Sequence, residues 1–486
     1  MPRIIRHGES EGQRAGYGRV LKGNRVGQRG NGRQARPTGR ARRGQRTRRG
    51  RILLWIAGAF SVLILAVAGV GAWVYQDLDG SIGAADIDGK VGDGRPEKLS
   101  PGSKNILVVG SDSRDGDNSE YGKGLTTMQS DTLMVVHIAA DRKWATVVSF
   151  PRDSWVEIPA CDKGDGTRSE AHHFKINEAF AIGGATGEVA SAAACTIRAV
   201  EQNTGLRIDH FMSVDFQGFK GMVNALGGIE VCPEQAIHDK KAHLDLEAGC
   251  QTVKDEDALG YVRTRYSVGD GSDISRIGRQ QEFMGALADR AKQKLTSPGE
   301  LYDFLKAATG SLTTDRSLAG VRPLAGLATE LKGVPEDRLT FLTVPNYPRE
   351  LDIPSDRANV VWQYPSAARL FTSLAEDEEV DEKRLAGEAK NALHARDVRV
   401  RVLNGTDRGG LAGRAAEELR QAGYTVTGTG NTPDTESKTR VSYPADQRAQ
   451  AQVLKSRLPG AAAEVSADAT TGAVTLVVGE DFKSLR

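Results

Sequence analysis

The sequence lacks the short motifs that mark several common enzyme classes. It contains no GxSxG nucleophile elbow, no Walker A loop and no HExxH pair. These absences leave a serine hydrolase, a P-loop nucleotidase and a zinc peptidase without support. Cysteine is also scarce, and the four cysteines form no CxxC or Cys/His spacing that would indicate a structural zinc site.

Negative charge is almost missing from the N-terminal segment. Residues 1–51 hold 16 Lys or Arg and two Glu, whereas the rest of the chain holds 49 basic and 61 acidic residues. The segment is rich in Gly, Arg and Gln and has little aliphatic periodicity, so we predict that it is disordered. Such a tail can contact anionic lipid headgroups, and nucleic acid is the less favoured partner because the next segment accounts for the charge.

Charge is absent altogether from residues 52–74. At about 1.5 Å per residue this stretch spans about 34 Å, enough for a hydrocarbon core of about 30 Å. It is longer than the apolar region of a cleaved signal peptide, about 7–15 residues, so we expect an uncleaved transmembrane anchor. The positive-inside rule then predicts a single-pass protein of the cell membrane, with residues 1–51 cytoplasmic and residues 75–486 extracellular.

All four cysteines, Cys161, Cys195, Cys232 and Cys250, follow the predicted anchor. An even number in an oxidising compartment predicts two disulfides, for which three pairings are possible. "GGIEVCPE" and "LEAGCQTV" both resemble short strands around a polar loop. This pattern favours Cys232–Cys250, which leaves Cys161–Cys195.

A chain of 486 residues is too long for one ordinary domain. Residues 75–102 are rich in Gly, Asp and Pro and are predicted to be a linker. Strands alternate with helices over residues 103–375, which predicts an α/β domain. A charged linker at residues 376–396 precedes a small α/β domain at residues 397–480, with the order strand, helix, strand, helix, strand.

Three polar clusters interrupt the buried strands of the larger domain: "GSDSR" at residues 110–114, "SDT" at residues 130–132 and "FPRD" at residues 150–153. Any one alone is more simply a solvated turn. Together with the arginines of "YVRTRYSVGDGSDISRIGRQQ" at residues 261–281, they suggest an anion site. Arginine forks pair with phosphate oxygens, and two carboxylates can hold Mg²⁺ when substrate phosphates add ligands. We therefore predict phosphoryl transfer by positioning and charge neutralisation.

The ordered set "GSDSR", "SDT", "FPRD", "KINEAF", "VNALGGIEV" and "YVRTR…SRIGRQQ", within residues 104–290, resembles the LytR–CpsA–Psr family of cell-wall glycopolymer ligases. The region around "VRVLNGT" resembles the C-terminal domain often appended to this family. The resemblance implies an α/β/α sandwich with a mixed sheet. It also implies an extracytoplasmic phosphotransferase in cell wall biogenesis, which moves a glycopolymer from a polyprenyl-pyrophosphate carrier to peptidoglycan through a phosphodiester.

The resemblance further implies roles for individual residues. Asp112 and Asp131 match magnesium-binding aspartates, with Mn²⁺ as an alternative ion. The positions that match pyrophosphate-binding residues are Arg114, Arg152, Lys175, Arg263, Arg265, Arg276 and Gln280. Asp273 matches an aspartate proposed to activate the incoming hydroxyl or to organise Arg276, so Asp273, Arg152 and Arg276 are the catalytic candidates. Gln129 stands where many members carry Arg, which removes one guanidinium from the phosphate site.

Spacing within the arginine-rich segment predicts its local structure. Arg263 and Arg265 are two residues apart and would share a face only on a strand, so an extended segment at residues 262–266 is expected. Arg276 and Gln280 are four apart and would share a helix face. Arg279 lies off that face and is predicted to be a surface or salt-bridge residue.

Two other functions fit the same residues. A pyrophosphatase would use water in place of the sugar hydroxyl, and its site would have the same sequence. A membrane-tethered transcriptional regulator would bind nucleic acid through residues 1–51 and would not need Asp131.

Overall fold

The computed structural model describes residues 76–80, 82–111, 128–264, 273–294, 298–309, 311–390, 392–466 and 469–486. The predicted tail and the predicted anchor at residues 52–74 lie outside these ranges. Within them, no helix is long and apolar enough to cross a membrane. The described residues all belong to one compact unit, residues 68–486.

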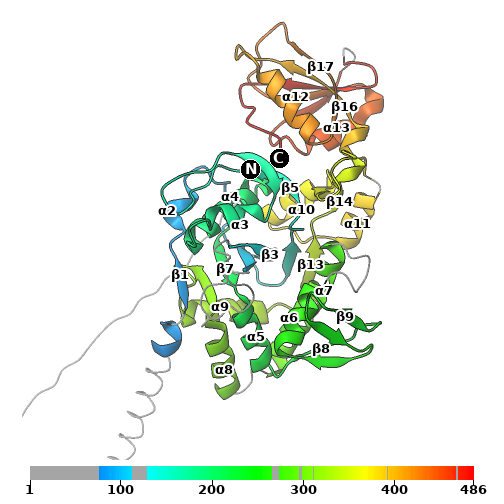
Figure 1. Ribbon diagram of the computed structural model, residues 1–486. Coiled ribbons are helices and arrows are strands. Elements are labelled where there is room, and N and C mark those ends of the chain that lie inside the picture. The colour runs from blue at the N-terminus through cyan, green and yellow to red at the C-terminus, as the bar shows by residue number, and fades with distance from the viewer. Residues whose placement is uncertain are drawn as a thin grey trace, which may run out of the picture. The chain divides into compact units, whose positions relative to one another are not determined.

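A seven-stranded mixed sheet forms the centre of the larger domain (Figure 1). In spatial order its strands are β1 (Gly83–Ala85), β12 (Leu312–Asp315), β7 (His210–Val214), β2 (Lys104–Ser111), β3 (Ser130–Ile138), β4 (Ala145–Ser149) and β13 (Leu339–Thr343). β2, β3 and β4 are antiparallel neighbours, whereas β7 is parallel to β2 and β13 is parallel to β4. The predicted mixed α/β sheet is confirmed. β1 is an addition to it, from the segment predicted to be a linker.

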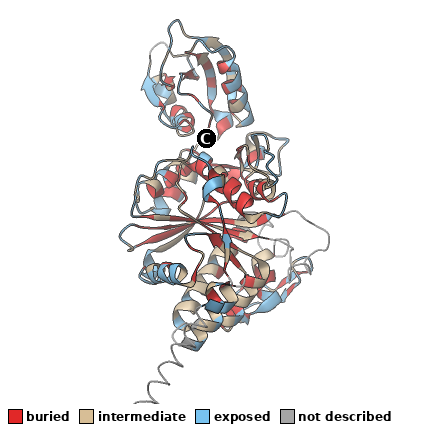
Figure 2. Cartoon of the chain, turned by 90° about the vertical axis from the view of Figure 1, so that its left-hand side faces the viewer, coloured by how far each residue is buried: buried red, intermediate tan, exposed pale blue. Residues whose placement is uncertain are grey.

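Helices lie on both faces of this sheet (Figures 1 and 2). One face carries α3 (Glu178–Gly183), α4 (Val189–Thr204) and α10 (Ser366–Ala375), and the other carries α9 (Val321–Lys332). Successive side chains of a strand point to opposite faces. Leu107 therefore packs in the core under α3, α4 and α10, while Ile106 packs with α9. The continuous apolar run of β2 reflects this burial on both sides.

A second hydrophobic cluster joins two small strand pairs to four helices. β8 (Ile229–Val231) pairs with β11 (Gln251–Val253), and β9 (Ile237–Asp239) pairs with β10 (Leu244–Leu246). The helices are α5 (Phe216–Ala225), α6 (Asp255–Arg263), α7 (Asp273–Lys294) and α8 (Pro298–Thr309). The disulfide Cys232–Cys250 closes the pair β8–β11, and Cys161–Cys195 is the other bridge, so the favoured pairing is confirmed.

The C-terminal domain has a five-stranded sheet in the order β17 (Thr425–Asn431), β16 (Arg399–Asn404), β20 (Val474–Val478), β18 (Arg440–Tyr443) and β19 (Ala462–Val465). α12 (Leu411–Gln421) and α13 (Arg448–Lys455) pack on it. The sequence predicted β16, β18 and β20 but missed both edge strands. β17 contains two glycines and β19 is exposed throughout, so neither shows the apolar alternation of a half-buried strand.

The remaining elements are short. They are α2 (Asp88–Val91), β5 (Trp155–Ile158), β6 (His172–Lys175), β14 (Asn346–Pro348), β15 (Val360–Trp362), α11 (Glu382–Lys390) and 3-10 turns at Glu336–Arg338, Arg349–Leu351, Ala395–Asp397 and Ala445–Gln447. β5 and β6 form an antiparallel pair, as do β14 and β15.

Arg349 connects the two domains. It is 6% exposed, and its guanidinium pairs with Asp356 within the larger domain. Nη2 donates to the carbonyl of Gln421 at the end of α12, at 2.5 Å. The same guanidinium lies 4.3 Å from the ring centroid of Trp155 on β5. One hydrophobic core runs through this junction, since it includes buried residues of both domains.

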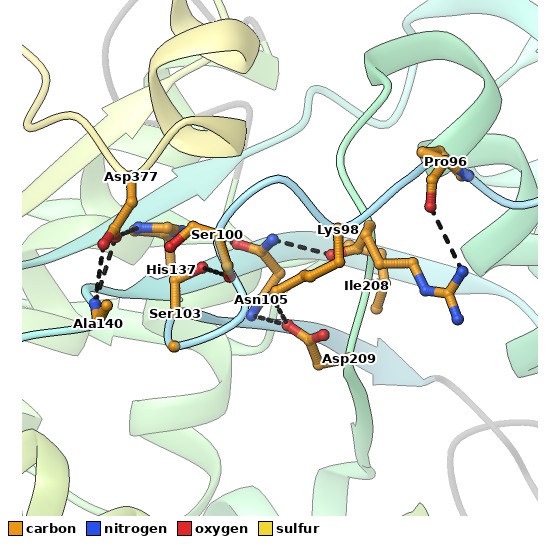
Figure 3. A network of polar contacts seen from close by, with 12 residues as sticks. Pro96, Lys98, Ser100, Ser103, Asn105, His137, Ala140, Ile208, Asp209 and Asp377 are labelled. Atoms are coloured by element: carbon orange, nitrogen blue, oxygen red, sulfur yellow. Dashed lines mark hydrogen bonds and ion pairs between the residues drawn. The ribbon is translucent and has the colours of Figure 1, made fainter.

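A polar network crosses β2 and β3 near the start of β2 (Figure 3). His137 Nδ1 lies 2.7 Å from Asn105 Oδ1, and His137 Nε2 lies 3.0 Å from Asp377 Oδ1. The backbone N–H of Asn105 donates to Asp209 at 2.7 Å. Because an oxygen faces each ring nitrogen of His137, both nitrogens donate only when the ring is protonated. The network fastens the connector after α10 to the sheet.

Candidate functional site

The polar motifs meet at one edge of the central sheet. β2 ends at Ser111, β3 begins at Ser130 and β4 ends at Ser149. Because β2–β3 and β3–β4 are antiparallel, these three strand ends lie together, and Ser111 pairs directly with Ser130. The motif "SDT" therefore lies beside the ends that lead into "GSDSR" and "FPRD".

A row of alternating charges lines this edge. Arg152 Nη1 donates to Asp131 Oδ1, and Arg152 Nε lies 3.8 Å from Asp153 Oδ1. Lys175 Nζ donates to the same Asp153 oxygen at 2.5 Å. These side chains are 19–33% exposed, so an anionic ligand can reach them. The row brings together the predicted residues Asp131, Arg152 and Lys175 and adds Asp153, which the sequence marked only as part of "FPRD".

Arg276 approaches the same row from α7. Its side chain is 4% exposed, and Nη2 donates to the backbone carbonyl of Asp131 at 3.3 Å. One turn later, Gln280 Nε2 donates to the carbonyl of Val262 at 3.0 Å. The two residues lie on one helix, as their spacing predicts. Gln280 therefore contacts the end of α6, while Arg276 contacts β3.

Gln281 holds α7 against the sheet and was not singled out by the sequence. Its Nε2 donates to Ser149 Oγ at 3.1 Å and to Thr343 Oγ1 at 3.2 Å. Ser149 ends β4 and Thr343 ends β13, which is parallel to β4. These contacts fix the position of α7 at the ends of β4 and β13, next to the row of charged side chains. The second Gln of "GRQQ" was the only signal for it.

Arg263 is the last residue of α6. The predicted extended segment at residues 262–266 is therefore wrong for residues 262 and 263, which are helical. The acidic first turn of α6 suits a helix N-terminus, and the helix continues until Thr264 turns out of it. Arg263 Cζ lies 4.7 Å from the ring centroid of Phe216 at the start of α5. α5 follows β7, which is parallel to β2, so Phe216 lies at the same end of the sheet as Ser111.

Arg279 is buried, so the prediction of a surface residue is wrong. It is 8% exposed, and Nη2 donates to the carbonyl of Thr264. Burial lowers the pKa of Arg279 below its usual value, while Tyr261, Glu282 and Asp239 oppose that shift. Residues three apart are neighbours on a helix, so the spacing from Arg276 was the overlooked signal.

Several predicted residues lie outside the described part of the chain. Asp112, Arg114 and Arg265 fall there, and so does the side chain of Asp273, the first residue of α7. Gln129 is described and exposed, two residues before Asp131. Among the described residues, no group of three or more His, Cys, Asp or Glu is arranged to hold a metal ion.

Comparison with known families identifies the larger domain. The model of the LytR_cpsA_psr family matches residues 74–374, which is more than half of the chain. The chain belongs to the LytR–CpsA–Psr family. A second model, described as LytR cell envelope-related transcriptional attenuator, matches residues 397–482.

Three curated relatives are similar to this family member. The probable cell wall biosynthesis protein LcpB of Corynebacterium glutamicum is 34% identical over 284 residues, 56% of this chain and 60% of LcpB. The cell wall biosynthesis protein LcpA of the same organism is 30% identical over 403 residues, 76% of this chain and 75% of LcpA. The polyisoprenyl-teichoic acid–peptidoglycan teichoic acid transferase TagT of Bacillus subtilis is 29% identical over 297 residues, 59% of this chain and 84% of TagT.

Proposed function

We propose that this protein is a glycopolymer–peptidoglycan phosphotransferase of the cell envelope. It would transfer a glycopolymer from a polyprenyl-pyrophosphate carrier to peptidoglycan and leave a phosphodiester. Relatives named for cell wall biosynthesis and for teichoic acid transfer to peptidoglycan support this substrate class. The observation that carries the proposal is the gathering of Arg152, Lys175 and Arg276 around Asp131 and Asp153 at one sheet edge.

The described cations suit a pyrophosphate. Arg152 and Lys175 are partly exposed, and each pairs with a carboxylate. A phosphate oxygen carries the same sign of charge and could take the place of that carboxylate. Arg276 is held at the backbone of Asp131, and the guanidinium of Arg263 lies over the ring of Phe216. Guanidinium groups held in fixed geometry stabilise the charge that develops on transferred phosphoryl oxygens.

The reaction is written as a displacement at phosphorus. An acceptor hydroxyl oxygen on peptidoglycan attacks the phosphorus that carries the glycopolymer. The bond from this phosphorus to the bridging oxygen breaks, and polyprenyl phosphate leaves with the electron pair. Asp273 accepts the proton of the hydroxyl, while Arg152 and Arg276 neutralise the phosphoryl oxygens.

Mg²⁺ fits the donor chemistry of the site, and Mn²⁺ would use the same ligands. Asp131 offers a carboxylate oxygen beside Arg152, and Asp112 would supply a second carboxylate. Two carboxylates suffice for Mg²⁺ when substrate phosphates complete its coordination. The bound ion would neutralise pyrophosphate charge and orient its oxygens.

The cellular placement is part of the same proposal. The uncharged residues 52–74 would be a single membrane anchor, with residues 1–51 in the cytoplasm and the catalytic domain outside. This topology would put the site next to membrane-borne polyprenyl carriers.

The test uses the full-length protein in detergent micelles or vesicles with a polyprenyl-pyrophosphate-linked glycopolymer. With peptidoglycan present, we expect a covalent glycopolymer–peptidoglycan phosphodiester and free polyprenyl phosphate. Release of polyprenyl phosphate at the same rate with and without peptidoglycan, and no conjugate, would instead identify a pyrophosphatase. Absence of both products would reject phosphoryl transfer from this carrier.

A further inference from the structure

Two neighbouring side chains of α7 donate hydrogen bonds to backbone carbonyls at the end of α6. Arg279 Nη2 donates to the carbonyl of Thr264, and Gln280 Nε2 donates to the carbonyl of Val262. The last carbonyls of a helix have no partner within the helix. Here the N–H of Thr264 closes the last turn by donating to Gly260 at 2.8 Å, and α7 supplies donors for the carbonyls beyond it.

Asp239 supports this contact from the other side. Thr264 is fully buried, and its Oγ1 donates to Asp239 Oδ2 at 2.6 Å. Asp239 is 4% exposed and also accepts the backbone N–H groups of Lys241 and Ala242, at 2.9 and 3.1 Å. A buried carboxylate and a buried guanidinium thus contact the same residue, Thr264, through its hydroxyl and its carbonyl. Buried charges persist when they are bonded in this way.

Thr264, which these contacts hold in place, directly follows Arg263. A cation at a helix C-terminus is favourable because it faces the negative end of the helix dipole. Arg279 therefore caps the C-terminal end of α6 and holds its last turn in place. Arg263 belongs to this turn, and its guanidinium lies over the ring of Phe216.

We propose that Arg279 is a positioning residue for the phosphate site, which acts by holding the end of α6 so that the guanidinium of Arg263 is preorganised. This inference rests on the proposed function for its reaction. Arg279 itself contacts the protein, whereas Arg263 contacts the substrate phosphates.

The chain offers a matched control on the same helix. Arg290 of α7 donates Nε to the carbonyl of Leu226, the residue that caps α5, at 3.2 Å. Arg290 thus makes the same kind of contact as Arg279, from an arginine to the end of a helix, eleven residues further along α7. A general need for arginine on α7 would affect both positions equally.

The experiment is a double-mutant cycle in the full-length protein. It compares wild type, R279M, R263A and R263A/R279M, with R290M as control and R279K as the conservative variant. Binding of inorganic pyrophosphate by calorimetry and turnover of the polyprenyl-pyrophosphate substrate are measured beside the melting temperature. Calorimetry applies whether or not the enzyme turns over.

We expect R279M to weaken pyrophosphate binding and to lower kcat/KM by about 10- to 100-fold, the loss of a charge-assisted bond. R263A/R279M should lie within about threefold of R263A alone, because Arg279 acts through Arg263. R279K should recover part of the loss, and R290M should stay within about threefold of wild type.

The inference is overturned if R279M binds pyrophosphate as wild type does, or if the losses of R263A and R279M multiply. Equal losses in R279M and R290M would also overturn it. Should R279M fail to fold, the cycle with R279K decides in the same way. Absent turnover in wild type would count against the proposed function alone, because the binding cycle still tests Arg279.

Discussion

The substitution Asp131→Asn would show whether Asp131 contributes to stability or to catalysis. The Arg152 and Asp131 side chains are 24% and 33% exposed, so their ion pair is open to solvent. Exposed pairs contribute about 0.2–1 kcal/mol. The variant should therefore lower the free energy of unfolding by less than about 1 kcal/mol, and Arg152 still has Asp153 at 3.8 Å.

The expected effect on activity is much larger. Asp131 would act by holding the Mg²⁺ ion that neutralises the pyrophosphate, and loss of one element that stabilises developing charge lowers kcat by about 10²- to 10³-fold, or about 3–4 kcal/mol. Turnover of the polyprenyl-pyrophosphate substrate and urea unfolding would be measured on the same preparation. Asp141→Asn is the control, because Asp141 lies between β3 and β4 at the opposite sheet edge and is 51% exposed. Turnover within about threefold of wild type would refute the assignment of Asp131, and a loss of stability above about 3 kcal/mol would make its role structural.

Three further predictions follow from the same structure. Arg263→Ala should weaken the binding of inorganic pyrophosphate, measured by calorimetry, by about 1.5–3 kcal/mol, and an unchanged Kd would remove Arg263 from the site. Replacement of both Cys161 and Cys195 by Ser should lower the free energy of unfolding by about 3–4 kcal/mol, because their bridge closes a loop of 34 residues; a urea midpoint close to that of wild type would contradict this. Burial, with Arg457 and Arg349 nearby, lowers the pKa of His173 to about 4 in the folded protein. As the pH falls, His173 is therefore protonated in the unfolded chain before it is protonated in the folded protein. The free energy of unfolding should fall as the pH drops from about 6.5 to about 4. His173→Gln should flatten that part of the curve of urea midpoint against pH, and an equal slope in both proteins would show that other groups cause it.

The sequence predicted the central strands well because they carry their signal locally. The apolar runs of β2, β3 and β4 and the polar residues at their ends were sufficient to place Asp131 and Arg152 at one sheet edge. The two disulfides were also predicted, because strand-like segments flank Cys232 and Cys250.

The errors arose where long-range contacts decide the structure. A period of two between Arg263 and Arg265 suggested a strand, but α6 continues to Arg263, and α7 supplies the donors at its end. Arg279 is among the residue types most often exposed, and its burial is accompanied by the contact with Thr264 and by the nearby Tyr261, Glu282 and Asp239. The strand β1 is three residues long and is defined by its partner β12.

The contact of Arg349 with both domains has a consequence for how the protein unfolds. Its guanidinium touches Trp155 on one side and the end of α12 on the other, and the surrounding core is continuous. Domains that share a core lose it together, so residues 76–486 should melt in one cooperative transition. A chain shortened before β16 would expose Trp155 next to the strand that carries Lys175, and would melt at a lower temperature.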